Sequence, residues 1–106
     1  MGQFDVHRNT GKSRTRYPYL VVVQSGHMRR WDRRVIVPLA IAEPFSSAPD
    51  IKLNPVVIVE GRRCYLAAQE ITNVPVDALG VVVGNLQDQA ETIIGAIDWM
   101  LSQGFG

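Results

Sequence analysis

The sequence contains a single cysteine and only two histidines, which excludes several ways of stabilising or activating a small protein. One thiol, Cys64, cannot form an internal disulfide. A zinc site needs three or more ligands, and Cys64, His7 and His27 do not have the spacing of any metal motif. Cys64 lies in the apolar run CYLAA, so we expect a buried small hydrophobe rather than a reactive thiol. We therefore predict no metal and no cofactor.

Long hydrophobic runs are also missing. No apolar stretch approaches the ~18 residues that a transmembrane helix requires, and the opening MGQFDVHRNTGKSR has no hydrophobic region of the signal-peptide kind. We therefore expect a cytoplasmic protein without membrane contact. The length of 106 residues predicts one domain over residues 1–106, and 46% apolar with 20% charged residues is typical of a folded globular chain.

The net charge is only +1, but the charges are unevenly distributed. Residues 1–42 contain eight Lys or Arg against two Asp, whereas residues 43–106 contain three against eight acidic residues. The first part is expected to attract anions and the second to attract basic partners. The basic stretch RRWDRR (29–34) suits nucleic acid or an acidic protein, because arginine pairs with phosphates and carboxylates. A solvated loop with Asp32 paired internally is the alternative.

Strand signals dominate the first two-thirds of the chain. The stretch 3–7 alternates, with Phe4 and Val6 on one face, and 17–25 and 35–40 are rich in β-branched and aromatic residues. Pro38 lacks an N–H and predicts a sheet edge or a bulge. The segments 54–59 and 63–71 flank Glu60-Gly61-Arg62, which is typical of a hairpin turn. Residues 72–80 are expected to form a turn with a short helical turn.

One helix is predicted near the C-terminus. Asp88 and Glu91 have the spacing of a capping box, so the helix should begin near residue 88. An apolar stripe at helical spacing should pack on the sheet and consists of Ala90, Ile93, Ile94, Ile97 and Leu101, flanked by Met100. Trp99 falls roughly opposite this stripe, where it would either contact a partner or cover a neighbouring loop. Many short strands followed by one helix predict a mostly β (α+β) fold, either a small partly closed barrel or a curled antiparallel sheet.

Catalytic motifs are scarce. The sequence has no Gly-x-Ser-x-Gly elbow and no phosphate-binding glycine loop. His7 is expected on the polar face of the first strand and His27 in the basic loop, both solvated. A ribonuclease needs only a base, an acid and a cation for the phosphate, so His27 beside the arginines keeps RNA cleavage open as an alternative.

Read in order, several segments resemble the CcdB family of toxins from bacterial toxin–antitoxin pairs. The resemblance covers Gln3 to Met100. It is carried by the opening QFDV, the strand from Arg16-Tyr17 to Val-Gln-Ser at Ser25, RRVIVPLA (33–40), LNPVVIV (53–59), Val74-Pro75-Val76, and the step Ala96-Ile97-x-x-Met100. No single segment is specific, but the ordered set is.

The resemblance implies an SH3-like, partly open barrel of antiparallel strands with one C-terminal helix, which forms a homodimer and has no catalytic activity. Members of the family bind the DNA gyrase A subunit and poison the gyrase–DNA complex. A cognate antitoxin with a disordered acidic segment neutralises them, and DNA is contacted only indirectly, through the antitoxin complex that regulates its own transcription. An acidic antitoxin suits the basic first part of this chain. We expect it to contact Arg8, Arg14 and Arg16.

The resemblance also implies a gyrase-contacting surface at the helix end and after the Val-Gln-Ser strand. On this chain it comprises His27, Met28, Asp98, Trp99, Met100, Leu101, Gly104 and Phe105. The family's terminal tryptophan has no counterpart, because Gln103 stands at its place when Gly104 and Phe105 align with the last two family residues. Trp99 or Phe105 would have to supply the aromatic anchor. Two alternatives follow: a divergent non-toxic relative that keeps antitoxin binding or autoregulation, and an endoribonuclease toxin on the same barrel.

Overall fold

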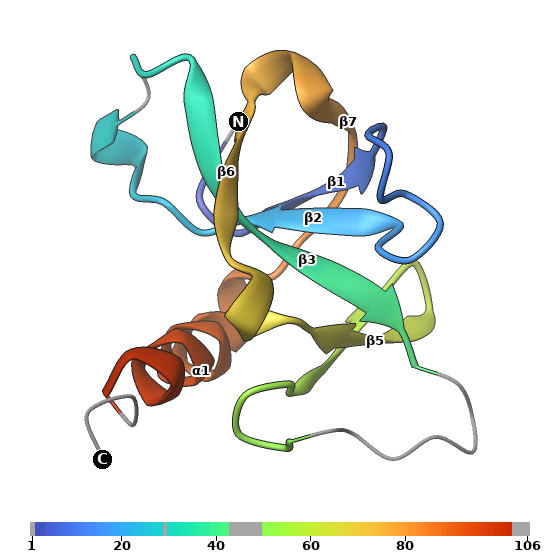
Figure 1. Ribbon diagram of the computed structural model, residues 1–106, viewed down its shortest axis with the longest axis vertical. Helices are drawn as coiled ribbons and strands as arrows, with labels where there is room; N and C mark the ends of the chain where they lie inside the picture. Colours follow the sequence, from blue (N-terminus) through green and yellow to red (C-terminus); the bar gives the residue numbers. More distant parts are fainter. Residues whose placement is uncertain (1, 29, 43–49, 103–106) are drawn as a thin grey trace.

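The computed structural model describes residues 2–28, 30–42 and 50–102. Within them, one antiparallel sheet has the strand order β4-β5-β3-β2-β1-β7, and β6 pairs with β3. The strands are β1 (Asp5–Asn9), β2 (Tyr19–Val22), β3 (Arg33–Ile41), β4 (Val56–Val59), β5 (Arg62–Leu66), β6 (Thr72–Pro75) and β7 (Leu79–Asn85). The helical elements are the 3-10 turns η1 (Gly26–Met28), η2 (Ala68–Glu70), η3 (Val76–Ala78) and η4 (Gln87–Gln89), and the helix α1 (Ala90–Ser102). The sheet curls into a partly open barrel with α1 at one end (Figure 1), which confirms the predicted fold class.

The core fills the inside of the curled sheet. Phe4 and Val6 lie together in it, as the alternation predicted, although Phe4 precedes β1 and has a positive φ of 68°. All four residues of β2 are buried, because Val74 of β6 and Leu79 of β7 pack against the outer side of this strand. A strand covered on both faces has a continuous apolar sequence, which explains the run YLVV. Among the described residues, no helix has the length and hydrophobicity needed to span a membrane.

The hairpin predicted around Glu60 and Gly61 is confirmed. β4 pairs with β5 in antiparallel register, from Val56 opposite Tyr65 to Val59 opposite Arg62. The two turn residues both have positive φ, 51° for Glu60 and 74° for Gly61. Two consecutive positive φ values are what a two-residue type I′ turn requires, and a glutamate in that conformation costs about 1 kcal/mol.

Pro38 lies in an interior strand, so the prediction of an edge or a bulge is wrong. β3 pairs with β2 on one side, where Pro38 is opposite Leu20. On its other side β3 pairs with β6 through residues 33–36 and with β5 through residues 39–41. The Pro38 carbonyl accepts the Ala67 N–H on this second side at 2.9 Å. The missing N–H therefore points to the place where β3 changes partner, and no ladder bond is lost.

The helical segment begins near residue 88 as predicted, because η4 leads directly into α1, but its cap and its packing differ from the prediction. The α-helical part begins at Ala90, after η4, and the side-chain oxygen of Asn85 accepts the Gln87 N–H at 2.8 Å. Within the described residues, no side-chain hydrogen bond of Asp88 or Glu91 forms the predicted capping box. The buried residues of α1 are Ile93 and Ala96, whereas Ile94 is 39% and Leu101 is 60% exposed. Ala90, Ile93 and Ile97 of the predicted stripe therefore pack on the core together with Ala96, whereas Ile94 and Leu101 do not. This packed face is rotated relative to the predicted stripe and rests against η2.

Strand β7 is an edge of the sheet. In the described part of the chain it pairs with β1 alone, and the register between the two strands shifts twice. Gly80 allows the two backbones to approach, because a Cβ there would lie 2.8 Å from the Arg8 carbonyl oxygen. Val81 and Val82 are 65% and 53% exposed. The outer side of β7 is thus apolar, uncharged and unpaired.

Candidate partner-binding surfaces

The last turn of α1 carries four predicted gyrase-contacting residues, Asp98 to Leu101, in unequal environments. Asp98 and Leu101 are exposed, whereas Trp99 and Met100 are partly buried. The Ser102 hydroxyl donates to the Asp98 carbonyl at 2.6 Å and closes the turn. Gly104 and Phe105, also predicted to contact gyrase, lie outside the described residues. Leu101 is therefore the apolar side chain of this turn that is most open to a partner.

Trp99 packs under a neighbouring loop, which is the second of the two interpretations open from the sequence. The Lys52 ammonium lies 4.3 Å from the centroid of the Trp99 ring, a cation–π contact. The loop is itself ordered by Asp50, whose Oδ1 accepts the N–H groups of Lys52 and Leu53 at 2.9 and 3.3 Å. Because the packed face of α1 is rotated, Trp99 lies at the border between helix and loop.

His27 and Met28 belong to η1, between β2 and β3. Both are exposed, Met28 by 48%, and the His27 N–H is accepted by the Ser25 hydroxyl at 3.2 Å. In Figure 1, η1 lies at the upper left and the end of α1 at the lower left. The structure therefore does not bring the two halves of the predicted gyrase surface together within one chain.

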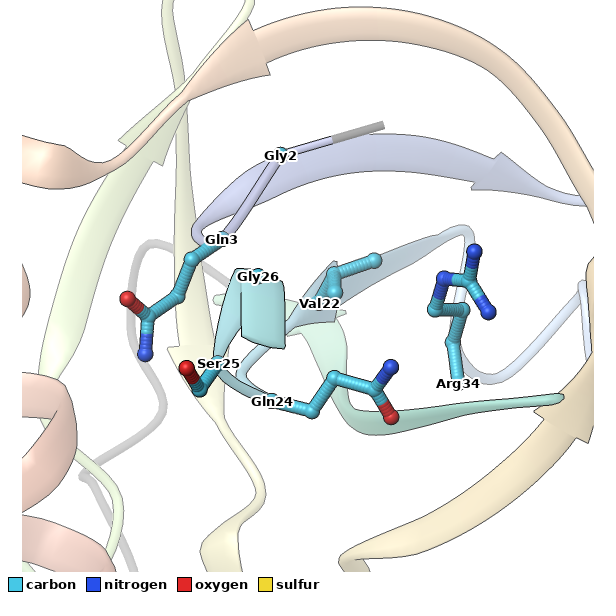
Figure 2. A pocket seen from close by; sticks show the side chains of 7 residues that line it. All are labelled: Gly2, Gln3, Val22, Gln24, Ser25, Gly26 and Arg34. Atoms are coloured by element: carbon cyan, nitrogen blue, oxygen red, sulfur yellow. The ribbon is translucent and has the colours of Figure 1, made fainter. Parts of the chain in front are cut away.

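Two buried polar side chains fasten the segment between β2 and β3. The Gln24 Oε1 accepts the Val35 N–H at 3.0 Å, and the Arg34 guanidinium donates to the carbonyls of Trp31 and Arg33. They help to line a cavity of about 10 Å³, room for a single water, whose other lining residues are Gly2, Gln3, Val22, Ser25 and Gly26. Figure 2 shows these side chains. Gln24 of the Val-Gln-Ser segment and Arg34 of the RRVIVPLA segment therefore stabilise the connection between β2 and β3.

Trp31 is the exposed aromatic of the basic stretch for which the sequence left nucleic acid, an acidic protein or a solvated loop open. It is 38% exposed, and it lies in the basic stretch 29–34. Within that stretch Arg34 is buried, and Arg33 donates to the side chain and carbonyl of Asn73 on β6. Arg30 is exposed. Among the described arginines of this stretch, Arg30 is therefore the one whose side chain is most accessible to a partner.

The three arginines expected to contact the antitoxin gather at β1 and the connection to β2. All three are exposed. Arg8 pairs with the Glu60 carboxylate at 3.0 Å, Arg14 donates to the Gly11 carbonyl at 3.0 Å, and the Arg16 guanidinium lies 5.2 Å from the Tyr17 ring centroid. An exposed ion pair of this kind contributes at most about 1 kcal/mol. Arg14 and Arg16 therefore keep their charges available to an acidic partner.

Glu60 connects this basic surface to the barrel core. Its carboxylate accepts the Tyr19 hydroxyl at 2.8 Å as well as the Arg8 guanidinium. Burial raises the pKa of Tyr19, and the hydrogen bond to Glu60 raises it further. Tyr19 therefore stays neutral and closes one end of the core. The strained backbone of Glu60 is compensated by these two contacts.

Among the described residues, no group of three or more His, Cys, Asp or Glu side chains is placed to hold a metal ion. His7 is buried, not solvated as expected, and its Nδ1 lies 2.9 Å from the Gly80 carbonyl. His7 is buried because residues 72–80 cross the outer face of the sheet, which a strand pattern cannot reveal. Cys64 is buried as predicted, and burial raises the pKa of its thiol.

The barrel fold is shared with toxins whose structures have been solved. An endoribonuclease in complex with its cognate antitoxin, from a mycobacterial species, has a TM-score of 0.74 at 16% identity, over 96% of this chain and 95% of that one. The Mycobacterium tuberculosis toxin MazF-mt6 has a TM-score of 0.71 at 13% identity, over 92% of this chain and 96% of that one. The TM-scores establish that this chain and these two toxins have a common fold.

The family follows from the sequence match. The model of the family described as CcdB protein matches residues 3–104, nearly the whole chain. The chain belongs to the CcdB family. This membership confirms the resemblance and supports the coarser functional prediction, a toxin of a toxin–antitoxin system.

Proposed function

We propose that this chain is a toxin that binds the DNA gyrase A subunit, poisons the gyrase–DNA complex and is neutralised by a cognate antitoxin. The family match over residues 3–104 carries the proposal. Residues 1–106 would act as one non-enzymatic toxin domain. The gyrase contacts would come from His27, Met28 and the end of α1, with Leu101 and Met28 as the exposed apolar members.

A supercoiling and cleavage assay with purified gyrase tests the proposal. We expect the protein to inhibit supercoiling and to raise the amount of cleaved DNA at low molar excess. Leu101→Ala should weaken this effect, whereas Ile58→Ala, a change at an equally exposed apolar residue on β4, should leave it intact. Full gyrase activity at a large molar excess of the wild-type protein would refute poisoning. Normal growth of gyrase-sensitive cells on induction would instead favour a non-toxic relative.

The antitoxin is proposed to contact Arg8, Arg14 and Arg16 with acidic residues. Because Glu60 already partners Arg8, most of the attraction should come from Arg14 and Arg16. Replacing these two by glutamate should weaken antitoxin binding and lessen its dependence on salt. Contact with DNA, and autoregulation, would then arise only in the toxin–antitoxin complex. Unchanged affinity and salt dependence in the doubly substituted protein would contradict this assignment.

RNA cleavage is the second candidate function, because a protein described as an endoribonuclease shares the fold and His27 is exposed beside a basic stretch. Incubation with mixed-sequence RNA tests it. Cleavage that is lost in His27→Ala would support an endoribonuclease. Absence of cleavage, or cleavage unchanged in the variant, would dispose of His27 as a catalytic base.

A further inference from the structure

Residues 72–82 cross the outer face of the sheet as a strap between two points that are fixed in the main core. Ile71 precedes this strap and Val83 follows it, and both side chains pack against the main core cluster. The strap comprises β6, η3 and the first part of β7, and Figure 1 shows the chain running up β6, turning at the top of the view and returning along β7. No side chain between the two fixed points is fully buried.

The strap packs on a small apolar cluster that is separate from the main core. Val74 and Leu79 contact the buried side chains of β2 and β3 on their outer side, and both are only partly buried themselves. These buried side chains are Leu20, Val22 and Ile36. Strands β2 and β3 pair directly with each other, so their pairing does not depend on the strap. Lifting the strap would therefore expose little apolar surface and cost much less free energy than unfolding the barrel.

A few hydrogen bonds attach the strap to the barrel. β6 pairs with residues 33–36 of β3, and the Val76 N–H donates to the Asp32 carbonyl at 3.0 Å. The exposed Thr10 hydroxyl donates to the Ala78 carbonyl at 2.8 Å. Bonds that face solvent exchange readily with water, so they add little to the free energy that keeps the strap closed.

The ladder between β1 and β7 is interrupted where the strap ends. The register shifts between Val6 and His7, which leaves Val83 without an opposite residue on β1. Beyond this interruption, the Asn85 side-chain amide donates to the Asp5 carboxylate at 2.9 Å. The strap can therefore separate from β1 without loss of the pairing that leads into α1.

His7 lies beneath the strap with one ring nitrogen unsatisfied. The side chain is 3% exposed, and its Nδ1 donates to the Gly80 carbonyl at 2.9 Å. A carbonyl oxygen can only accept, so this bond places the proton on Nδ1 and leaves a lone pair on Nε2. Nε2 is buried and has no hydrogen-bond partner among the described residues. A buried acceptor without a partner is unfavourable, and water could satisfy it as soon as the strap lifts.

We propose that the strap, residues 72–82, opens as a unit while the barrel and α1 stay folded. The open state hydrates Nε2 of His7 and exposes the apolar cluster of β2 and β3. The closed strap is a cover over a second apolar face of the sheet, and its opening is a local event with its own equilibrium.

Diethyl pyrocarbonate, which modifies unprotonated imidazole nitrogens, tests the opening because the chain has two histidines in opposite environments. His27 is exposed and should react at once, whereas His7 should react only through the open state. Mass spectrometry of the peptides gives both rates. We expect the His7 rate to stay constant at low urea, because a local opening exposes little surface, and to exceed the rate that global unfolding allows.

Val74→Ala removes part of the contact between strap and sheet and should raise the His7 rate about fivefold or more. Thr10→Val deletes the hydroxyl bond to the strap without touching either core and should raise the rate as well. Val57→Ala is the matched control, the same substitution at a buried position of the main core. It should lower the urea midpoint and leave the His7 rate in the absence of urea unchanged.

Three results would each overturn the opening of the strap. The first is a His7 rate that rises with urea from the lowest concentration. The second is an increase with Val57→Ala as large as that with Val74→Ala. The third is a His7 rate no higher than global unfolding allows in the wild-type protein and in both strap variants.

Discussion

At the scale of single residues, a few polar side chains connect segments that are distant in sequence. The Asp5 carboxylate accepts the Gly2 N–H at 2.7 Å and the Asn85 side-chain amide at 2.9 Å. Asn85 in turn accepts the Gln87 N–H ahead of α1. Asp5 thus links β1 to the end of β7, the strand that leads into the helix.

Asp5→Asn should reduce the loss of unfolding free energy that accompanies a fall in pH into the acid range. Burial on its own would raise the pKa of Asp5, but the hydrogen bonds from Gly2 and Asn85 outweigh it, so the pKa is lowered. A lowered pKa contributes stability that is present above the ordinary value of about 3.9 and is lost as the pH falls through the lowered value. Urea unfolding between pH 7 and pH 2 measures this loss. Exposed Asp77→Asn is the control, and an equally steep acid limb in both variants would contradict the prediction.

Gly80→Ala should destabilise the protein by about 1–3 kcal/mol. The added Cβ would lie 2.8 Å from the Arg8 carbonyl oxygen, a backbone atom that moves only if β1 and β7 separate. Gly84 lies in the same strand and has no atom within 4 Å of the equivalent position. Chemical denaturation of the two alanine variants compares them directly, and a loss as large in Gly84→Ala as in Gly80→Ala would count against close approach as the cause.

At the scale of elements, α1 uses one face for the fold and leaves another free. The packed face contains Ile93 and Ala96 and meets η2, whereas Glu91, Ile94 and Asp98 face outward. The cation–π contact between Lys52 and Trp99 connects the end of the helix to the loop that precedes β4. The helix is therefore held in a fixed position on the fold. A partner that binds its outer face would pay little conformational entropy for ordering the helix backbone.

Ile93→Ala and Ile94→Ala should differ strongly in stability. Ile93 is fully buried, so its truncation should cost about 2–5 kcal/mol. Ile94 is partly exposed on the outer face, and its truncation should cost less than about 1 kcal/mol. Thermal and urea unfolding of the two variants measure both values. Equally large losses in the two variants would instead support the predicted stripe, in which both isoleucines pack on the sheet.

At the scale of the whole molecule, the sheet has two apolar edges of different length, β4 and β7. β4 is a short edge that ends at Val59, and its last two residues, Ile58 and Val59, lie opposite Arg63 and Arg62 of β5. β7 is longer, has no charged residue and exposes Val81 and Val82. An apolar, unprotected edge strand favours pairing with another strand, and the longer β7 offers more backbone groups to a second copy than β4 does.

Val82→Lys should therefore convert a proposed homodimer into a monomer. The lysine would place two like charges near the two-fold axis of a β7–β7 pair. Ile58→Lys on β4 puts the same charge on the other exposed edge and should leave the dimer intact. Light scattering after size exclusion measures the masses. A wild-type monomer would remove the dimer itself, and dissociation by Ile58→Lys alone would move the interface to β4.

The sequence by itself determined the β-rich fold, the Glu60-Gly61 hairpin, the burial of Cys64 and the family, because these depend on local alternation, turn chemistry and an ordered set of motifs. The tertiary structure decided what depends on residues that are distant in sequence. The crossing of residues 72–80 buried His7, and the change of partner along β3 accommodated Pro38. The rotation of α1 against η2 exposed Ile94, left Gly95 open and set Trp99 under Lys52. A helical stripe can be read from spacing, but the rotation of a helix on its sheet is fixed only by the side chains it meets.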